Sequence, residues 1–403
     1  MPEIAIIGGG AGGMMAALTA AENPENRVRL FERQARVGRK LLSTGNGRCN
    51  LTNLNCSPAH YHSETPEFVG SALEAFPVSE TLQWFRERGL VTVTEDSGRV
   101  YPLSNSANSV LDVLRLSIEQ SENITVSTAA PVLEIKRTGT GFTVKTEQES
   151  FHADKVIVAC GGMAGSKLGG VKDGYTLLQS LGHSRTSLHP ALVQLTTETE
   201  YPKRLKGVRA DARLTLSSSR KTLMRTEGEV QFTEKGVSGP AVFDLSRAAS
   251  VSDEKLQLTL DFLREYNIKD VFSMLVNRRD RLPGLPAEEL LTGVLHNRLG
   301  RTILHYVNLD TKKTMAQITD MELKDIARAC KGFTLPVKGT EGFDSAQVTA
   351  GGVKCSEFDP NTMESKLVPG LYACGEVLDV DGDCGGFNLQ WAWASGHLAG
   401  RLL

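Results

Sequence analysis

The sequence predicts an α/β protein of the Rossmann type that is interrupted by a long insertion. The first observation is a βαβ unit at the N-terminus: an apolar run at 4–7, a small-residue helix over 11–22 and a second strand at 28–31. A short apolar run of this kind is typical of a strand buried in a parallel sheet. The second observation is that glycine-rich strand–turn–helix segments return after about residue 340. The third is that residues 191–340 have a different periodicity from both flanks.

The composition excludes several other classes of protein. A chain of 403 residues is long enough for about two to three domains, and 40% hydrophobic with 23% charged residues is ordinary for a globular protein. A formal net charge of -2 does not indicate a strongly basic nucleic-acid-binding protein. No apolar run reaches the roughly 18 residues of a membrane span, and no basic segment precedes the first strand, so we expect neither a membrane segment nor a secretory leader.

The seven cysteines carry no metal or redox motif. They are scattered, and no Cys-x-x-Cys occurs. A zinc ribbon or a thioredoxin-like centre requires that spacing, so we expect no metal site. An odd number of unpatterned cysteines is typical of a reducing compartment, and we therefore expect a cytoplasmic protein.

The first part of the chain, residues 1–190, continues the α/β pattern. We expect helices at 66–75, 79–88 and 106–120. Strand-like segments at 132–137 and 142–146 flank Gly139-Thr140-Gly141, which predicts a hairpin. Residues 155–159 form another apolar run and predict a further buried strand.

The insertion contains two kinds of structure. Segments such as 213–216 and 257–260 alternate in the manner of strands, so we expect a β-barrel-like subdomain over 191–261. Apolar residues at helical spacing follow, which predicts a small helical subdomain over 262–339. Residues 340–403 then complete the first domain.

A dinucleotide fingerprint begins directly after the first strand. Gly8, Gly10 and Gly13 form the pattern G-x-G-x-x-G, and Ala11 opens the helix. In this pattern the first glycine permits a tight turn, the second lets the backbone approach a pyrophosphate, and the third allows close packing of helix and strand. Glu32 ends the next strand, where a carboxylate accepts hydrogen bonds from ribose hydroxyls. The fingerprint therefore predicts a bound dinucleotide, without deciding between NAD and FAD.

The C-terminal segment indicates that this dinucleotide is FAD. A strand over 371–374 runs into Gly375 and Glu376, and an acidic stretch that ends at Asp383 follows. Flavoproteins use such a late turn to bring a carboxylate and backbone N–H groups to the ribityl chain and pyrophosphate. Gly386 and Phe387 then precede a last helix over 388–402, which opens with Asn388 and Leu389. A helix N-terminus at this place stabilises negative charge on a reduced flavin ring.

With these residues identified, the chain resembles the BaiN/YhiN-like flavoproteins of bacteria. The resemblance extends over nearly the whole length and includes long blocks at 38–53, 160–162, 236–240, 349–353 and 385–390. It implies FAD bound by the two ends of the chain, with a β subdomain and a helical subdomain between them. Members of the family commonly carry Thr where this chain has Cys160 and Cys384, and Tyr where it has Phe387.

The expected cofactor-binding residues include those of the fingerprint, the late turn and the last helix named above. The others are Arg33, Arg39, Lys40, Ser43, Asn46, Gly47, Arg48, Cys49, Asn50, Val132, Cys160, Gly161 and Gly162. Arg48 and Asn50 are the candidate catalytic residues, because a charged and an amide side chain in a glycine-rich loop suit an anionic substrate or the reduced flavin. The alternative is that this loop only wraps the cofactor, since Asn and Gly are also what tight turns require.

Two hypotheses for function follow. The first is an FAD-dependent oxidoreductase that exchanges a hydride with a small organic substrate through flavin N5. No second G-x-G-x-x-G follows a strand, so NADH or NADPH as reductant would dock transiently between the FAD-binding part and the insertion. The second is a flavoprotein linked to RNA, since residues 201–225 hold eight Lys or Arg and one acid. The helical part of the insert, residues 262–335, carries 12 Lys or Arg against 9 Asp or Glu, an excess too small to favour RNA over a small substrate. A flavin-binding protein without catalysis stays open as a third possibility.

Overall fold

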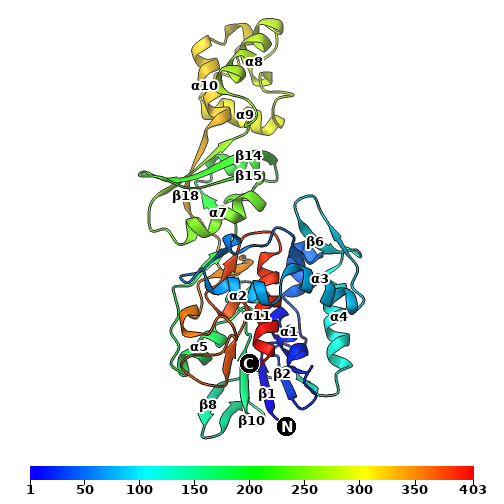
Figure 1. Ribbon diagram of the computed structural model, residues 1–403. Helices are drawn as coiled ribbons and strands as arrows, with labels where there is room; N and C mark the ends of the chain where they lie inside the picture. The colour runs from blue at the N-terminus through cyan, green and yellow to red at the C-terminus, as the bar shows by residue number, and fades with distance from the viewer. The chain divides into compact units, whose positions relative to one another are not determined.

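The computed structural model describes residues 1–403, which divide into two units. Unit 1 combines Met1–His189 with Gln347–Leu403, and unit 2 is Pro190–Ala346. The two ends of the chain therefore belong to the same unit, as the blue and red segments in Figure 1 show. The predicted Rossmann-type α/β fold with a barrel-like insertion is confirmed.

A five-stranded parallel sheet forms the centre of unit 1. Its order is β20-β11-β1-β2-β7. The bounds are β20 Leu371–Ala373, β11 Lys155–Val158, β1 Glu3–Ile7, β2 Arg27–Phe31 and β7 Ile124–Ser127. The register pairs Ile4 with both Lys155 and Val28. Because all five strands are parallel, their carboxyl ends meet at one edge of the sheet, where ligands bind in open α/β sheets.

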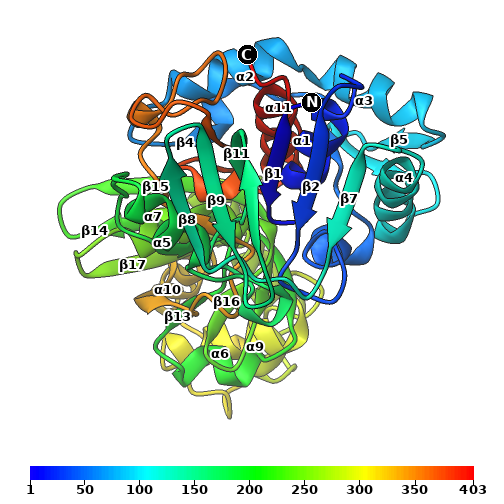
Figure 2. The same ribbon diagram turned by 90° about the horizontal axis from the view of Figure 1, so that it is seen from below.

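Two helices from opposite ends of the chain pack against each other beside this sheet. They are α1, Ala11–Ala20, and α11, Phe387–Gly400, and Figure 2 shows them next to β1. Nine of the ten residues of α1 are buried, so this helix is apolar on all sides. The contact is close because both helices carry glycine there. A Cβ at Gly396 would lie 2.5 Å from the carbonyl oxygen of Gly12.

The other elements of unit 1 lie near their predicted positions. Its remaining helices are α2 Phe68–Ala75, α3 Val78–Glu87, α4 Ala107–Glu119 and α5 Asp173–Ser180. The hairpin is confirmed as β8 Glu134–Thr138 and β9 Gly141–Lys145, which form a three-stranded sheet with β10 Ser150–Ala153. Short strands complete the unit: β3 Thr52–Asn53, β4 Tyr61–His62, β5 Thr92–Thr94, β6 Arg99–Pro102, β19 Val348–Ala350 and β21 Asp381–Gly382. The linking strand β12 is His189–Ala191.

Unit 2 contains a closed six-stranded barrel. The strand order is β13-β16-β15-β14-β17-β18. The bounds are β13 Leu195–Thr197, β14 Arg209–Ser218, β15 Thr222–Phe232, β16 Gly236–Ser238, β17 Leu256–Asp261 and β18 Phe333–Thr340. Alternate residues of β14 and β17, such as Leu214 and Leu258, are fully buried, as the period of a strand requires.

One expectation for the insertion is wrong, and one element of it was not predicted. The helical subdomain does not extend to residue 339, because β18 returns to the barrel and pairs with both β13 and β17. The β region also contains a helix, α7, Pro240–Ser250. Its proline stands at the first helical position, and Val242, Leu245 and Ala249 give it a buried face at helical spacing.

Three helices form the remainder of the insertion, with α6 Glu200–Leu205 beside the barrel. They are α8 Ile268–Arg281, α9 Asn297–Tyr306 and α10 Asp320–Lys331. The side chain of Asn267 accepts hydrogen bonds from two backbone N–H groups at the start of α8. Thr319 and Glu322 form a capping box at the start of α10. None of the helices in the protein combines the length and apolarity needed to span a bilayer.

The contact between α1 and α11 predicts a specific loss of stability. The substitution Gly396→Ala places a methyl group against the backbone of α1, and we expect it to lower the free energy of unfolding by about 1–3 kcal/mol, the usual cost of overpacking a core. A urea titration followed by circular dichroism measures this value. Gly70→Ala on α2 is the matched control, since no atom lies within 4 Å of its Cβ position. Equal unfolding midpoints for Gly396→Ala and Gly70→Ala would contradict a close contact between α1 and α11 at Gly396.

Candidate functional site

A deep cleft opens at the carboxyl edge of the parallel sheet. It lies entirely within unit 1, and its empty volume is about 1410 Å³ including its open mouth. The lining comes from the ends of β1, β2, β11 and β20 and from the first residues of α1 and α11. The cleft therefore follows the sheet from the acid at the end of β2 to the start of the C-terminal helix.

Three glycines expose bare backbone to this cleft. Gly10, Gly161 and Gly375 follow the neighbouring strands β1, β11 and β20, and no atom lies within 4 Å of a Cβ built on any of them. All three line the cleft. Their missing side chains leave a cradle in which a ligand can approach the main chain. Gly13 has a different role, because a Cβ there would collide with the carbonyl oxygen of Gly8 on the turn after β1.

The start of α1 offers an anion site. Gly10 is its N-cap, and no side chain caps the first turn. The unpaired N–H groups and the positive end of the helix dipole therefore face the cleft, as in phosphate sites of other proteins. This arrangement fits a pyrophosphate.

Glu32 lies at the end of β2 and is 9% exposed. Its carboxylate accepts hydrogen bonds from the backbone N–H of Gly9 at 2.8 Å and of Gln34 at 2.7 Å. These bonds fix the carboxylate at the wall of the cleft and leave lone pairs on both oxygens. A ribose diol is the ligand that such a fixed acceptor suits.

An ion pair joins two other walls of the cleft. The Lys40 ammonium donates to the Glu376 carboxylate at 2.8 Å, and the same carboxylate accepts from the backbone N–H of Thr349 at 2.8 Å. Lys40 and Glu376 are about one-third and one-fifth exposed. The pair thus holds the loop after β2 against the turn after β20, with polar atoms on the ligand side.

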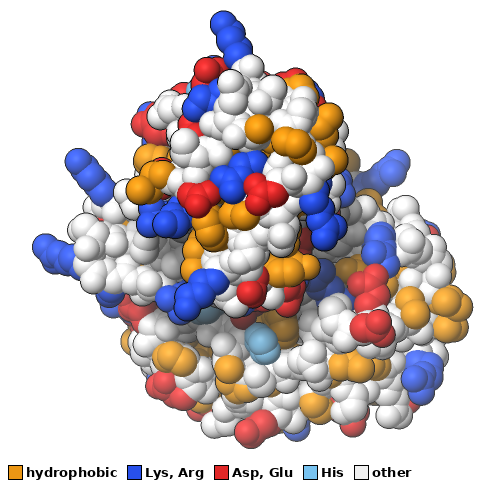
Figure 3. Space-filling view, turned by 90° about the horizontal axis from the view of Figure 1, so that it is seen from above, with side chains coloured by type: hydrophobic (Ala, Val, Ile, Leu, Met, Phe, Trp, Pro, Cys, Tyr) orange, Lys and Arg blue, Asp and Glu red, His pale blue; other side chains and the backbone are white.

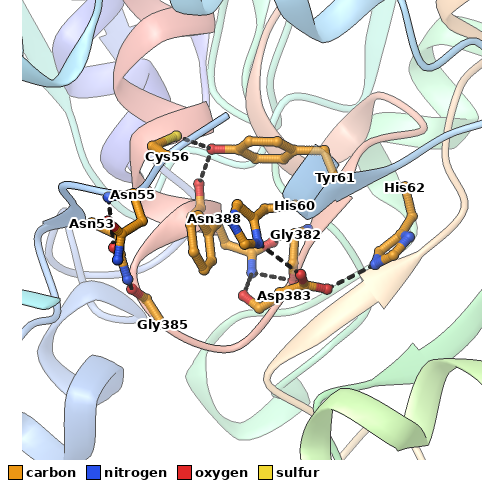
Figure 4. Close-up of polar contacts among 11 residues, drawn as sticks. Asn53, Asn55, Cys56, His60, Tyr61, His62, Gly382, Asp383, Gly385 and Asn388 are labelled. Carbon is orange, nitrogen blue, oxygen red and sulfur yellow. Dashed lines mark hydrogen bonds and ion pairs between the residues drawn. The ribbon is translucent and has the colours of Figure 1, made fainter. Parts of the chain in front are cut away.

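The loop at 50–53 holds the start of α11. Gly386, the N-cap of that helix, has a φ of 102°, and a Cβ there would lie 2.5 Å from the Thr52 carbonyl oxygen. Asn53 donates to the Gly385 carbonyl at 2.9 Å. The Oδ1 atom of Asn50 is buried without a partner, 2.8 Å from the same Cβ position. These contacts place the predicted glycine-rich loop against the helix N-terminus, as Figure 4 shows for Asn53 and Gly385.

The Asn388 side chain is already committed to the protein. Its amide oxygen accepts from the Gly382 N–H at 2.8 Å, and its amide nitrogen donates to the Gly382 carbonyl at 2.8 Å. Figure 4 shows this clamp beside Asp383. Asn388 lines the cleft, but its amide oxygen and nitrogen are both bonded to Gly382. Its side chain therefore holds the backbone turn before α11.

The structure brings most of the predicted cofactor residues to the cleft. Those that line it are Gly8, Gly10, Ala11, Glu32, Arg33, Arg39, Lys40, Val132, Cys160, Gly161, Gly162, Gly375, Glu376, Asn388 and Leu389. Those that do not line it are Gly13, Ser43, Asn46, Gly47, Arg48, Cys49, Asn50, Asp383, Gly386 and Phe387.

Arg48 lies in a network on the protein surface. Its guanidinium pairs with Glu95 at 2.9 Å, donates to Asn105 and lies 3.9 Å from the centre of the Tyr101 ring. These partners belong to β6 and the loops around it. The observed role of Arg48 is therefore to tie the 43–53 loop to this small sheet.

Cys160 and Cys374 at the cleft, and Cys49 in the nearby loop, are poor nucleophiles. Burial raises the pKa of Cys49, Cys160 and Cys374 to about 12, which keeps each thiol protonated at neutral pH. A thiolate is required for nucleophilic or disulfide chemistry. The geometry thus supports a packing role for these residues.

Sequence reasoning missed two histidines near the start of α11. His60 and His62 both contact the Asp383 carboxylate. No motif marked them, because Asp383 is more than 300 residues away in the chain. The one available signal is their closeness in the chain, with His60 directly before β4 and His62 on it.

The parallel sheet and the glycine-lined cleft define the Rossmann-type FAD-binding fold. A family model described as the HI0933-like protein Rossmann domain matches residues 2–402. The chain belongs to this family, and its predicted resemblance to the BaiN/YhiN-like flavoproteins is confirmed.

Curated relatives extend over the full chain. A 3-dehydro-bile acid delta(4,6)-reductase from Clostridium scindens is 39% identical, with 100% of this chain and 98% of the relative covered. A ribosomal RNA dihydrouridine synthase from Escherichia coli is 30% identical, with 97% and 95% covered. The protein is a flavin-dependent oxidoreductase, as the sequence predicts.

Solved structures agree on the fold. A 3-ketosteroid delta1-dehydrogenase from Sterolibacterium denitrificans is similar with a TM-score of 0.51 at 11% identity, over 100% of this chain and 99% of the other. The FrdA subunit of the Escherichia coli quinol fumarate reductase also has a TM-score of 0.51, at 16% identity, over 99% and 69% of the two chains. At these identities the likeness concerns the fold alone.

Three of the eight basic side chains in the strip at 201–225 form ion pairs within unit 2: Lys206, Arg209 and Arg213. Lys206 pairs with Glu234 at 3.0 Å, and Arg213 pairs with Glu227. Asp211 and Glu227 also pair with Arg264. On the face drawn in Figure 3, Lys and Arg side chains are spread among acidic, hydrophobic and uncharged ones rather than gathered in one patch. The other five basic side chains of the strip have no acidic partner, so ion pairing leaves most of its charge in place.

Gly10 permits a direct test of the cleft. In Gly10→Val the new Cβ has no atom within 4 Å, so the fold is expected to survive while the approach to the pyrophosphate site is blocked. We expect the purified variant to lose flavin absorbance by more than tenfold with an unchanged circular dichroism spectrum. Gly284→Val, at another glycine with open space around its Cβ position but outside the cleft, is the control. Full flavin loading of Gly10→Val would show that the pyrophosphate lies elsewhere.

Proposed function

We propose that the protein is an FAD-dependent reductase of carbon–carbon double bonds conjugated to a carbonyl group, with NADH or NADPH as transient reductant. The observation that carries this proposal is the combination of the glycine-lined cleft with 39% identity to a bile acid reductase over the full length of both chains. FAD, when bound, supplies the hydride chemistry at its N5 atom.

The residues of the cleft suit the parts of FAD in order. Glu32 is placed to bind the ribose of the adenosine half, and the start of α1 at Gly10 to bind the pyrophosphate. The bare backbone at Gly161 and Gly375 leaves room for the ribityl chain. Leu389, at the opposite end of the lining from Glu32, belongs to the helix whose N-terminus is expected at the flavin ring.

The two curated relatives suggest one shared chemistry. The name of the Clostridium scindens relative describes reduction of a 3-dehydro-bile acid at its delta(4,6) double bonds, which are conjugated to the 3-oxo group. The second forms dihydrouridine, which requires reduction of a uracil double bond that is also conjugated to a carbonyl. In both cases the hydride adds to the carbon of the double bond that is farther from the carbonyl group. One catalytic arrangement can therefore serve either substrate.

A small polycyclic enone is the substrate class that we propose first. The bile acid reductase is the more similar of these two relatives, 39% against 30%. The chain carries a net charge of -2. Binding to RNA depends on an excess of Lys and Arg at phosphates, so this charge favours the small substrate.

Anaerobic mixing identifies the reductant. We expect NADH or NADPH at 1 mM to bleach the bound flavin within seconds to minutes, and we expect hyperbolic dependence of the rate on its concentration, because the coenzyme binds transiently. Stopped-flow absorbance at the flavin bands measures this rate. Dithionite reduction provides the reference for a fully reduced flavin. A flavin that dithionite bleaches and both nucleotides leave oxidised would remove NAD(P)H from the proposal.

The substrate class is tested with the reduced protein. We expect a 3-oxo-4-ene bile acid to reoxidise the flavin anaerobically and to gain two hydrogens, detected by mass spectrometry. The saturated 3-oxo bile acid is the control, since it lacks the double bond. Ribosomal RNA fragments from cells without dihydrouridine form the second arm. Turnover of RNA with no reaction of the enone would replace the first substrate class with the second.

A further inference from the structure

Two histidines share one carboxylate at the start of α11. Asp383 contacts Nδ1 of His60 at 3.1 Å through one oxygen and Nε2 of His62 at 2.9 Å through the other. Figure 4 shows the carboxylate between the two imidazole rings. The group is built by the pairing of β4 with β21, and the Asp383 N–H donates to the His60 carbonyl at 2.9 Å. The arrangement is therefore fixed by backbone as well as by side chains.

His60 is held directly against the end of the helix. Its ring stacks on Phe387, with centroids 4.2 Å apart and an angle of 15° between the planes. Phe387 is 5% exposed, and its carbonyl accepts from the Tyr61 hydroxyl at 2.9 Å. The next residue, Asn388, lines the cofactor cleft. His60 does not line the cleft itself, but it is held against Phe387, the residue directly before Asn388.

The three side chains remain open to water. His60 and His62 are each 35% exposed and Asp383 is 26% exposed. In His60 the bond to Asp383 uses Nδ1, so Nε2 is the nitrogen left to exchange a proton. Imidazole is the side chain that changes charge between about pH 5 and 8. A solvent-reachable imidazole that is bound to a carboxylate can serve as a general acid where it comes within hydrogen-bond reach of the atom that receives the proton.

The proposed reduction requires such an acid. The π bond of the substrate breaks and two C–H bonds form, one from a hydride at the β-carbon and one from a proton at the α-carbon. The substrate gains two electrons, which the reduced cofactor loses. The hydride brings both electrons, so the proton must come from an acid of the protein or from water.

We propose that Nε2 of His60 delivers this proton, and that Asp383 and His62 are positioning residues which orient His60 and connect it to solvent. The inference rests on the proposed reduction of a conjugated double bond. After each transfer the neutral His60 takes up a proton from water. Asp383 stabilises the charged imidazolium that must form before the next cycle.

The surrounding groups leave the neutral pH range to the histidines. Burial opposes ionisation of Asp383, but its hydrogen bonds with His62 and His60 outweigh that cost and hold its pKa below the ordinary value. Burial raises the pKa of Tyr61 well above its usual range and also raises that of Cys56. The titratable residues next to His60 on β4, β21 and the segments that flank them are Asp381, Asp383, Cys384, Tyr61, His62 and Cys56. The helices that contact this segment add Glu74 on α2 and His397 in the last turn of α11. Phe387 on α11 carries no charge.

Two substitutions separate proton transfer from structure. In His60→Asn the side-chain amide N–H takes the place of Nδ1, the atom of His60 that contacts Asp383. In His62→Gln the amide N–H takes the place of Nε2, the atom of His62 that contacts Asp383. Each variant therefore keeps the contact with the carboxylate and removes an imidazole. We expect His60→Asn to slow anaerobic reoxidation of the dithionite-reduced flavin by a 3-oxo-4-ene bile acid at least about 100-fold, the usual contribution of a general acid. The fall of the wild-type rate at alkaline pH should disappear. His62→Gln should slow the reaction less.

Flavin content and the unfolding midpoint should match those of the wild type in both variants. His152→Asn is the control, because His152 is an exposed residue on β10 away from this cluster. A readout without turnover is ¹³C-histidine NMR of the flavin-loaded oxidised protein. The His60 ring signals should change in Asp383→Asn, because the carboxylate that contacts Nδ1 is lost. If His60→Asn fails to fold, His60→Gln and this comparison keep the test decisive.

The outcomes distinguish this inference from the proposed function. A wild-type protein that no enone reoxidises contradicts the proposed function and the inference with it. A reactive wild type together with a His60→Asn variant of equal rate and pH profile overturns the role of His60 alone. His60 ring signals that are unchanged in Asp383→Asn would also overturn it.

Discussion

The architecture of unit 1 depends on the close approach of α1 to backbone on two sides. Gly13 lets the helix lie against the turn after β1, where any Cβ would collide with the Gly8 carbonyl. Gly12 lies against Gly396 of α11 on the other side. Because side chains are absent at these contacts, the position of α1 is set by main-chain atoms that have little freedom to move. The direction in which the N-terminus of α1 points into the cleft can therefore vary little.

This constraint also explains why both ends of the chain belong to one unit. The last helix completes the packing of α1, and β20 adds the strand whose turn carries Gly375 and Glu376. The N-terminal loop in turn fixes the start of α11 through Asn53 and the His60–Asp383 contact. The cofactor cleft and the candidate proton donor are therefore parts of one assembly, in which the helix start links the two.

The sequence predicts the elements that depend on local patterns. The βαβ unit, the hairpin around Gly139 and the late Gly375–Glu376 turn follow from residue spacing alone. The closing strand β18 does not, because Pro336 and the helical residues before it hide its alternation, and its partners β13 and β17 lie far away in the chain. The helix α7 was missed because its face is short and lies between strands. The cluster of His60, His62 and Asp383 depends on the pairing of β4 with β21, which no local pattern records.

A structure of the protein with FAD bound tests the central claim most directly. The cleft predicts that the pyrophosphate oxygens accept hydrogen bonds from the backbone at the start of α1 and that the adenosine ribose lies within hydrogen-bond distance of Glu32. It also predicts the flavin ring at the N-terminus of α11. FAD bound in any other place, or with its adenosine half at α11 and its ring at Glu32, would contradict the account.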